Sequence, residues 1–148
     1  MDILDELKEG IVTASAEETE AVGARLAAAV VDNSTIALSG DLGAGKTTLA
    51  RGIARGLEIT ADVTSPTYTI YTTYQGTRQL VHMDAYRLSD AHELDSLTIE
   101  EFLKPPWLIV VEWPEHVPGF FEDKDTLRIK IEILPDHSHR IHIIDQEP

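Results

Sequence analysis

A phosphate-binding loop is the strongest chemical signal in this sequence. Residues 40–47 read GDLGAGKT and fit the G-x-x-x-x-G-K-[ST] pattern at every position. Glycines in this pattern let backbone N–H groups turn inward and approach phosphate oxygens closely. Lys46 then reaches the β- and γ-phosphates of a nucleotide, and the Thr47 hydroxyl is placed to ligate Mg²⁺. The pattern therefore predicts binding of a magnesium-bound nucleoside triphosphate.

The loop and one tryptophan form the expected nucleotide-binding set. In the loop, this set is Asp41, Leu42, Gly43, Ala44, Gly45, Lys46, Thr47 and Thr48. Trp113 is a further candidate, because an indole ring can stack on a nucleobase. Stacking on a partner protein and half-buried packing are equally compatible with this tryptophan. Its role therefore stays open at this point.

Two acidic residues each follow an aliphatic run, as in a Walker B motif. Asp84 closes the run at residues 80–83, and Glu112 closes the run at residues 108–111. Such a carboxylate can meet Mg²⁺ directly or through water, and a second one can orient the attacking water. We expect Thr47, Asp84 and Glu112 to serve the metal. Lys46, Asp84 and Glu112 form the expected catalytic set, and the division of roles between the two acids stays open.

The hydrophobic pattern predicts the elements that place these groups. The expected strands are residues 10–14, 35–39, 68–74, 79–84, 107–111, 127–133 and 140–143, and the expected helices are residues 15–33, 47–57 and 90–103. Ser15 and Glu18 match a capping box at the start of the first helix. The sum is an α/β fold, a P-loop NTPase-like three-layer sandwich with a central mixed β-sheet and antiparallel hairpins. Phosphate sites in such sheets lie at the carboxyl ends of the strands.

Length and charge limit the classes of protein that this chain can be. The 148 residues predict one P-loop ATPase domain, residues 1–148, with residues 1–9 as a mobile extension. A net charge of −14 disfavours unaided binding of nucleic acid. The apolar runs are too short to span a bilayer, and the acidic first residues do not resemble a signal peptide. We therefore expect a cytoplasmic protein without membrane attachment.

Three further groups have a functional and a structural interpretation. Residues 64–67, Thr-Ser-Pro-Thr, could sense the γ-phosphate and Mg²⁺ or simply form a turn before a strand. Arg87 could neutralise phosphate charge or form a surface salt bridge. His137, His139 and His142 are not expected to bind a metal, because no supporting acid is evident.

Four motifs together resemble the bacterial TsaE (YjeE) family. These are GDLGAGKTT at 40–48, SPTY at 65–68, HMDAYRL at 82–88 and VEWPE at 111–115. The family comprises P-loop ATPase subunits of the machinery that makes N6-threonylcarbamoyladenosine in tRNA. The resemblance implies that Lys46 binds phosphate, Thr47 and Asp84 serve Mg²⁺, and Glu112 supports hydrolysis. It also implies a switch-like loop at 64–67 and a position near the nucleotide for Trp113.

The same resemblance implies protein partners. In this family the partners are TsaD and TsaB, and transfer of the threonylcarbamoyl group belongs to TsaD. ATP hydrolysis here would reset or regulate that complex, weakly alone and faster with partners, with tRNA contacted only indirectly. Two departures from the family pattern, Tyr68 for Phe and Ala85 for Leu, affect local packing only.

Three other functions are alternatives to an ATPase subunit: a small-molecule kinase, a GTPase and a non-enzymatic assembly module. A small-molecule P-loop kinase would use Asp84 as a base and Arg87 as a phosphate clamp, but the sequence after Leu103 offers prolines and acids instead of an Arg-rich lid. A GTPase is disfavoured because the sequence contains no N-K-x-D segment. A non-enzymatic alternative is an assembly module whose ATP turnover is incidental.

Overall fold

The computed structural model describes residues 2–41, 43–64, 71–86, 99–117 and 125–144. The strands in this part of the chain are β1 (Ile11–Thr13), β2 (Ser34–Ser39), β3 (Tyr71–Gln75), β4 (Gln79–Asp84), β5 (Trp107–Glu112), β6 (Thr126–Ile133) and β7 (His139–Ile143). The α-helices are α1 (Ile3–Glu9), α2 (Ala16–Ala29) and α3 (Lys46–Gly56), and two short 3₁₀ helices are η1 (Ile99–Phe102) and η2 (Pro114–His116).

The strands form one seven-stranded mixed sheet in the order β1-β7-β6-β2-β5-β4-β3. Its centre is parallel, because β2 pairs with β5 and β6, and β4 pairs with β5, in that orientation. Antiparallel pairs complete both edges, β3 with β4 on one side and β6 with β7 and β1 on the other. The expected α/β class with a mixed sheet and antiparallel hairpins is confirmed.

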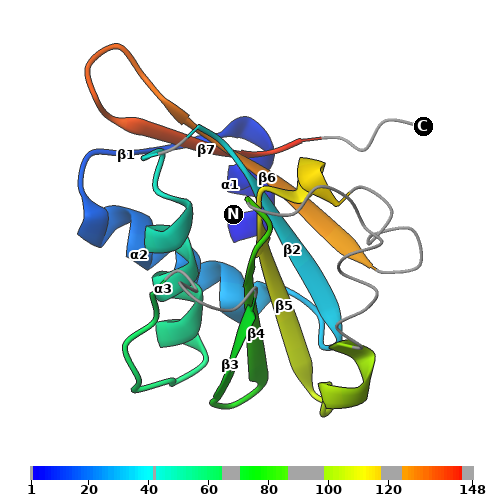
Figure 1. Cartoon of the computed structure of the whole chain (residues 1–148). Helices are drawn as coiled ribbons and strands as arrows, with labels where there is room; N and C mark the ends of the chain where they lie inside the picture. Colours follow the sequence, from blue (N-terminus) through cyan, green and yellow to red (C-terminus); the bar gives the residue numbers. More distant parts are fainter. Residues whose placement is uncertain (1, 42, 65–70, 87–98, 118–124, 145–148) are drawn as a thin grey trace.

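Hydrophobic side chains cover both faces of this sheet. On one face, residues of all three α-helices pack with β2, β4 and β5 into the larger core, which includes Leu26, Leu49 and Leu108. Figure 1 shows α2 and α3 side by side on this face. On the other face, η1 and the residues around η2 cover a smaller cluster that contains Met83 and Val111. Helices therefore lie on both sides of the sheet, which gives the three layers.

Helices α2 and α3 approach each other through glycines. A Cβ added at Gly52 would lie 2.2 Å from the carbonyl oxygen of Glu20, and one added at Gly23 would lie 2.5 Å from that of Leu49. Neither position has room for a side chain, because the obstacle is backbone that cannot rotate away. The close contact fixes α3, the helix that follows the phosphate-binding loop, against α2.

Because of this contact, we expect the exchange Gly52→Ala to lower the stability of the protein. Alanine is favoured over glycine inside a helix by about 1 kcal/mol, yet overpacking here should cost about 2 kcal/mol net. We expect the melting temperature to fall by roughly 4–8 °C. Ala28→Gly, the reverse exchange at an exposed position of α2, is the control and should cost only about 1 kcal/mol. A Gly52→Ala protein as stable as the unchanged one would contradict this packing.

Two expectations about helices are wrong. Residues 3–9, expected to be part of a mobile extension, form α1, whose Ile3 and Leu7 are buried in the larger core. The side chain of Asp2 caps this helix by accepting a hydrogen bond from the Asp5 N–H. Residues 99–102, the described end of the helix expected at 90–103, form the 3₁₀ helix η1. Residues 90–98 lie outside the described part.

Element boundaries elsewhere follow the sequence closely. The capping box is present: Ser15 Oγ accepts from the Glu18 N–H, and the Glu18 carboxylate accepts from the N–H of Ala14. Helix α2 ends at Ala29, before the residues 32–33 expected from the sequence. Of the strand expected at 68–74, residues 68–70 lie outside the described part, and β3 continues to Gln75.

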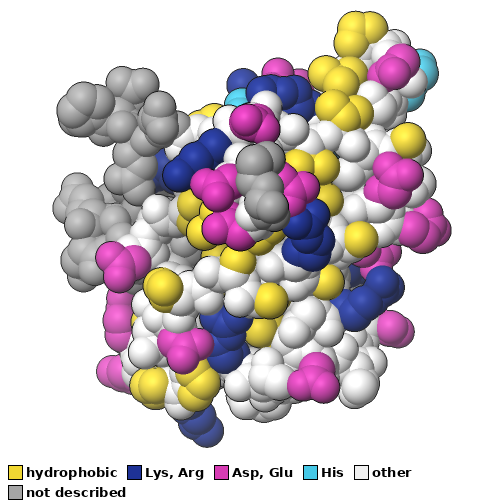
Figure 2. Space-filling view, turned by 180° about the vertical axis from the view of Figure 1, so that it is seen from behind, with side chains coloured by type: hydrophobic (Ala, Val, Ile, Leu, Met, Phe, Trp, Pro, Cys, Tyr) yellow, Lys and Arg dark blue, Asp and Glu magenta, His cyan; other side chains and the backbone are white. Residues whose placement is uncertain are grey.

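The surface is acidic overall, with a net charge of −14. On the face seen in Figure 2, Lys and Arg side chains are interspersed with Asp and Glu side chains. The described residues of that face therefore form no continuous basic surface. Within the described residues, no helix has the length and apolar character needed to cross a bilayer.

Candidate nucleotide-binding site

The phosphate-binding loop connects β2 to α3, as the sequence predicted. Its three glycines have conformations that side chains rarely adopt, Gly40 with φ +149°, Gly43 with φ +81° and Gly45 with φ +108°. A Cβ added at Gly43 would have no neighbouring atom within 4 Å among the described residues. A Cβ added at Gly45 would lie 3.1 Å from His139 Nδ1. The first-turn N–H groups of α3 end at this loop, so the positive end of the helix faces any bound anion.

Lys46 is folded back onto the loop that precedes it. Its ammonium group donates to the carbonyl oxygens of Gly40 and Asp41, the latter at 3.0 Å, and lies 4.2 Å from the centre of the Trp113 ring. Burial lowers the pKa of Lys46, while nearby carboxylates, Glu112 foremost, act in the opposite direction. Phosphate oxygens are charged and therefore stronger acceptors than these carbonyls. A bound phosphate could replace them as the partner of this ammonium.

The two predicted acids lie side by side at the carboxyl ends of β4 and β5, where Asp84 pairs with Glu112 in the strand register. Glu112 is 4% exposed, and its carboxylate oxygens lie 3.0 and 3.1 Å from the Thr47 hydroxyl, which donates to them. Asp84 is half-buried and accepts from the Tyr86 N–H at 3.0 Å. Thus the hydroxyl and the buried acid are already in contact.

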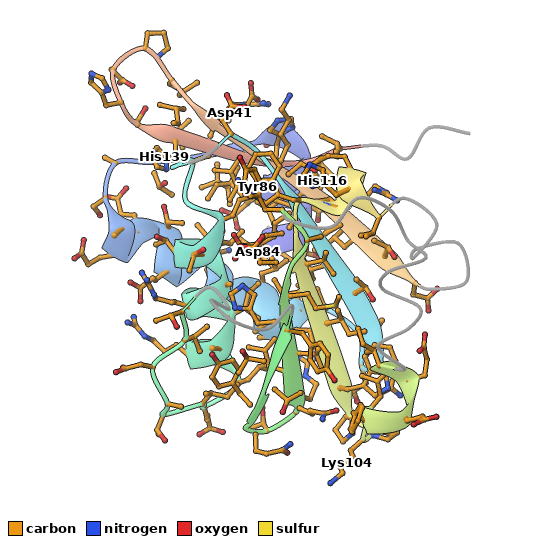
Figure 3. All side chains as sticks on the ribbon, in the orientation of Figure 1. Asp41, Asp84, Tyr86, Lys104, His116 and His139 are labelled. Carbon is orange, nitrogen blue, oxygen red and sulfur yellow. The ribbon has the colours of Figure 1, made fainter. Side chains whose placement is uncertain are left out.

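These groups surround a cavity of about 290 Å³. It is lined by Gly43, Gly45, Lys46, Thr47, Thr48, Asp84, Tyr86, Glu112 and Trp113. Lysine, hydroxyl and both acids thus share one space, with Asp84 and Tyr86 at the same end of the sheet in Figure 3. This space, the first cavity, is lined by all the residues predicted to be catalytic.

The donor set of the first cavity fits Mg²⁺. This hard cation prefers oxygen ligands, and the hydroxyl of Thr47 with the carboxylates of Asp84 and Glu112 supplies them. Among the described residues, no group of three or more His, Cys, Asp or Glu side chains could hold a metal ion. A cation here would therefore need further oxygens, from phosphate or water, which is usual for Mg²⁺ at nucleotides.

A second cavity of about 250 Å³ also borders the loop. It is lined by Thr13, Ala14, Ser15, Ala16, Thr19, Gly43, Gly45, Thr48, His137 and His139. Gly43, Gly45 and Thr48 therefore line both cavities, and an elongated ligand could occupy the two across the loop. The sequence did not indicate residues 13–16 or His139 as part of the site, because no nucleotide-binding motif includes them.

An aromatic cluster borders the first cavity. The ring of Trp113 lies 5.0 Å from that of Tyr86 and 5.7 Å from that of His116, measured between centroids. Trp113 also has a left-handed backbone, with φ 62° and ψ 52°, which is uncommon for a bulky residue. In this structure the tryptophan packs on these rings and on the Lys46 ammonium. Tyr86 and His116 were not predicted as site residues, although Tyr86 belongs to the motif at 82–88 and His116 follows the motif at 111–115.

The remaining predicted residues have less specific positions. Asp41 is exposed and Ala44 is buried in the larger core. Leu42, Arg87 and residues 65–68 lie outside the described part, which also excludes most of the proposed switch loop. His142 is separate from the second cavity and pairs with Glu132 at 2.8 Å, so an acid does accompany this histidine, contrary to expectation.

Comparisons with known proteins identify the family. A family model described as threonylcarbamoyl adenosine biosynthesis protein TsaE matches residues 13–141. A Treponema pallidum relative is 33% identical over 132 residues, covering 89% of this chain and 97% of the relative. A Bacillus subtilis relative is 43% identical over 102 residues, covering 68% and 63%. Both are named tRNA threonylcarbamoyladenosine biosynthesis protein TsaE.

A solved structure agrees with these matches. The crystal structure of Bacillus subtilis YdiB superposes with a TM-score of 0.74 and 32% sequence identity, covering 90% of this chain and 82% of the other. The stretch matched by the family model extends from the end of β1 to β7 and includes the loop and both strand-end acids. The chain therefore belongs to the TsaE family.

Proposed function

We propose that this protein binds and hydrolyses magnesium-bound ATP in the biosynthesis of threonylcarbamoyladenosine in tRNA. The supporting observation is the convergence of Lys46, Thr47, Asp84 and Glu112 on one cavity at the phosphate-binding loop. The names of the relatives supply the pathway. The whole chain, residues 1–148, would act as one ATPase domain in the cytoplasm.

The two cavities suggest how ATP would lie. The phosphates would occupy the first cavity, where the α3 N-terminus and the Lys46 ammonium offer positive charge. The ribose and base would extend into the second cavity, which has hydroxyl and imidazole groups on its walls. Loop residues 41–48 would contact the nucleotide from between the cavities. Trp113 would border the phosphates, because its ring now rests on the lysine that they would attract.

The acids and the hydroxyl would divide the work of hydrolysis. A bound Mg²⁺ would neutralise charge on the phosphate oxygens. Thr47 and Asp84 would hold it, with Glu112 close enough to share it. Glu112 would also orient the attacking water, since its carboxylate is fixed by neighbouring donors. Lys46 would stabilise negative charge on the transferred phosphoryl group.

Charge argues for indirect contact with tRNA. With a net charge of −14, the chain would be repelled by a phosphate backbone. The family resemblance supplies TsaD and TsaB as the partners that would hold the tRNA. Hydrolysis here would then reset or regulate their complex.

Two assays test the proposal. ATP turnover should be slow for the isolated protein, faster with TsaD and TsaB, and absent when EDTA removes Mg²⁺. A pull-down from a native extract, with and without ATP, should recover the same two subunits. Failure of a calorimetric titration to detect binding of ATP or ADP would overturn the proposal. Transfer of labelled phosphate to a small-molecule acceptor would indicate a kinase instead.

A further inference from the structure

A buried histidine contacts Glu112, a residue that lines the first cavity, and has no part in the function proposed above. His82 lies in β4, two residues before Asp84, and is 0% exposed. Its Nε2 atom is 2.6 Å from Oε2 of Glu112. An ionised carboxylate can only accept hydrogen bonds, so Nε2 carries the proton and donates it to Glu112.

The strand geometry makes this contact a fixed one. His82 and Val110 are partners in the parallel pair of β4 and β5, and Asp84 and Glu112 are partners two residues further along. Side chains two residues apart in a strand share a face. His82, Asp84 and Glu112 therefore all face α3 and Thr47, with the histidine deepest in the core. The imidazole ring therefore contacts the Glu112 carboxylate from the side of the core.

The Nδ1 atom of His82 indicates that packing alone does not account for a histidine at this position. Within the described residues, Nδ1 is buried and has no hydrogen-bond partner. Leaving a buried polar atom unpaired costs about 1–3 kcal/mol. The neighbours Leu80, Val81 and Met83 are apolar and buried, so packing alone favours an apolar residue here. Among the described groups, the bond to Glu112 is the one polar contact of this ring that could offset that cost.

The Glu112 carboxylate would depend on the His82 donor when nucleotide and Mg²⁺ are bound. In the structure, Glu112 accepts from His82 and from the Thr47 hydroxyl. If the Thr47 hydroxyl oxygen served as a ligand of Mg²⁺, its hydrogen bond to Glu112 would be weakened. His82 then remains to hold the buried carboxylate in one orientation. A free carboxylate would rotate and no longer present a constant oxygen to the water.

We propose that His82 is a positioning residue, which orients Glu112 for ATP hydrolysis through the Nε2–Oε2 hydrogen bond. The inference rests on the proposed function and adds a residue to it. The proposed role involves no proton transfer by the imidazole, only donation of a hydrogen bond from Nε2 to Glu112. Loss of the bond should therefore affect the rate of the chemical step more than the binding of ATP.

Exchanges at position 82 separate this role from simple packing. His82→Gln keeps an N–H donor near the place of Nε2, whereas His82→Asn has an amide that is too short to reach Glu112. We expect kcat to fall about 10–100-fold in His82→Asn, with KM changed less than about threefold. His82→Gln should recover most of kcat. If His82→Asn does not fold, His82→Leu serves as the donor-free variant of more similar volume.

A double-mutant cycle provides the second measurement. If His82 acts only through Glu112, then His82→Asn should slow turnover less than about twofold further in a Glu112→Gln background. Thr35→Val is the matched control, because Thr35 Oγ1 is also buried and unpaired within the described residues but lies near the start of β2, at the opposite end of this strand from the phosphate-binding loop. It should leave kcat unchanged. Equal kcat in His82→Asn, His82→Gln and the unchanged protein, or equal losses in both backgrounds, would overturn the inference.

The failure of this inference is distinct from failure of the function. If the unchanged protein shows no ATP turnover, the proposed function itself is wrong. If the unchanged protein is active and the variants at position 82 are equally active, only the proposed role of His82 is wrong. Melting temperatures and ADP affinity without Mg²⁺, measured for every variant, show whether a loss of turnover reflects misfolding.

Discussion

Exchange of Glu112 for Gln should slow ATP hydrolysis about 100-fold or more, which corresponds to about 2.7 kcal/mol of transition-state stabilisation. The amide keeps the size of the side chain but loses the negative charge that would orient the water and face the metal. Affinity for ATP should stay within about threefold, because the phosphates bind mainly to the loop and to Lys46. Single-turnover hydrolysis and calorimetry measure the two quantities separately.

The neighbour Glu115 provides the matched control for this exchange. It lies three residues further along, is exposed, and carries the same charge near Lys46. Glu115→Gln should leave turnover unchanged. A Glu112→Gln protein that hydrolyses ATP at the normal rate would remove Glu112 from the mechanism. One that lacks hydrolysis but supports full tRNA modification would favour the assembly module in which turnover is incidental.

Exchange of Lys46 for Ala should weaken ATP binding about 100-fold, because charge-assisted bonds to phosphate contribute about 1.5–3 kcal/mol each. Turnover should be lost together with binding at ordinary ATP concentrations. The expected effect is on affinity first, in contrast to Glu112→Gln. Calorimetric titration with ATP measures it directly.

A distant lysine controls for the loss of charge. Lys104 is exposed and lies at the opposite end of the sheet in Figure 3, so Lys104→Ala should bind ATP normally. Lys46→Ala also leaves the Gly40 and Asp41 carbonyls without their donor, so its melting temperature should be recorded alongside. Unchanged ATP affinity in a folded Lys46→Ala protein would mean that the loop is not a phosphate site.

The sequence predicts the parts of this site that depend on local pattern. Residues 40–47 contain their own spacing signal, and Asp84 and Glu112 each follow an apolar run that marks a strand end. Their proximity could also be anticipated, since the carboxyl ends of parallel strands lie along one edge of a sheet. The contact between Thr47 and Glu112 and the close pairing of the two acids depend on strand order, which the sequence does not specify directly.

The parts that the sequence missed depend on contacts between distant segments. Thr13 and His139 reach the loop only because β1 and β7 pair beside β6, and no local pattern encodes that pairing. His82 did have a signal, a polar residue within a buried apolar strand, but its meaning needed the position of Glu112. Helix α1 was missed because its seven residues are too few to establish a clear period.

The direct contact between the backbones of α2 and α3 limits where the molecule can respond to a ligand. Side chains usually separate the backbones of two packed helices, but at Gly23 and Gly52 the backbones are in direct contact. We therefore expect α3, the helix that follows the phosphate-binding loop, to keep its position relative to α2. Adaptation between empty and occupied forms would then concentrate in torsions of Lys46 and Trp113, the two groups that now rest on each other.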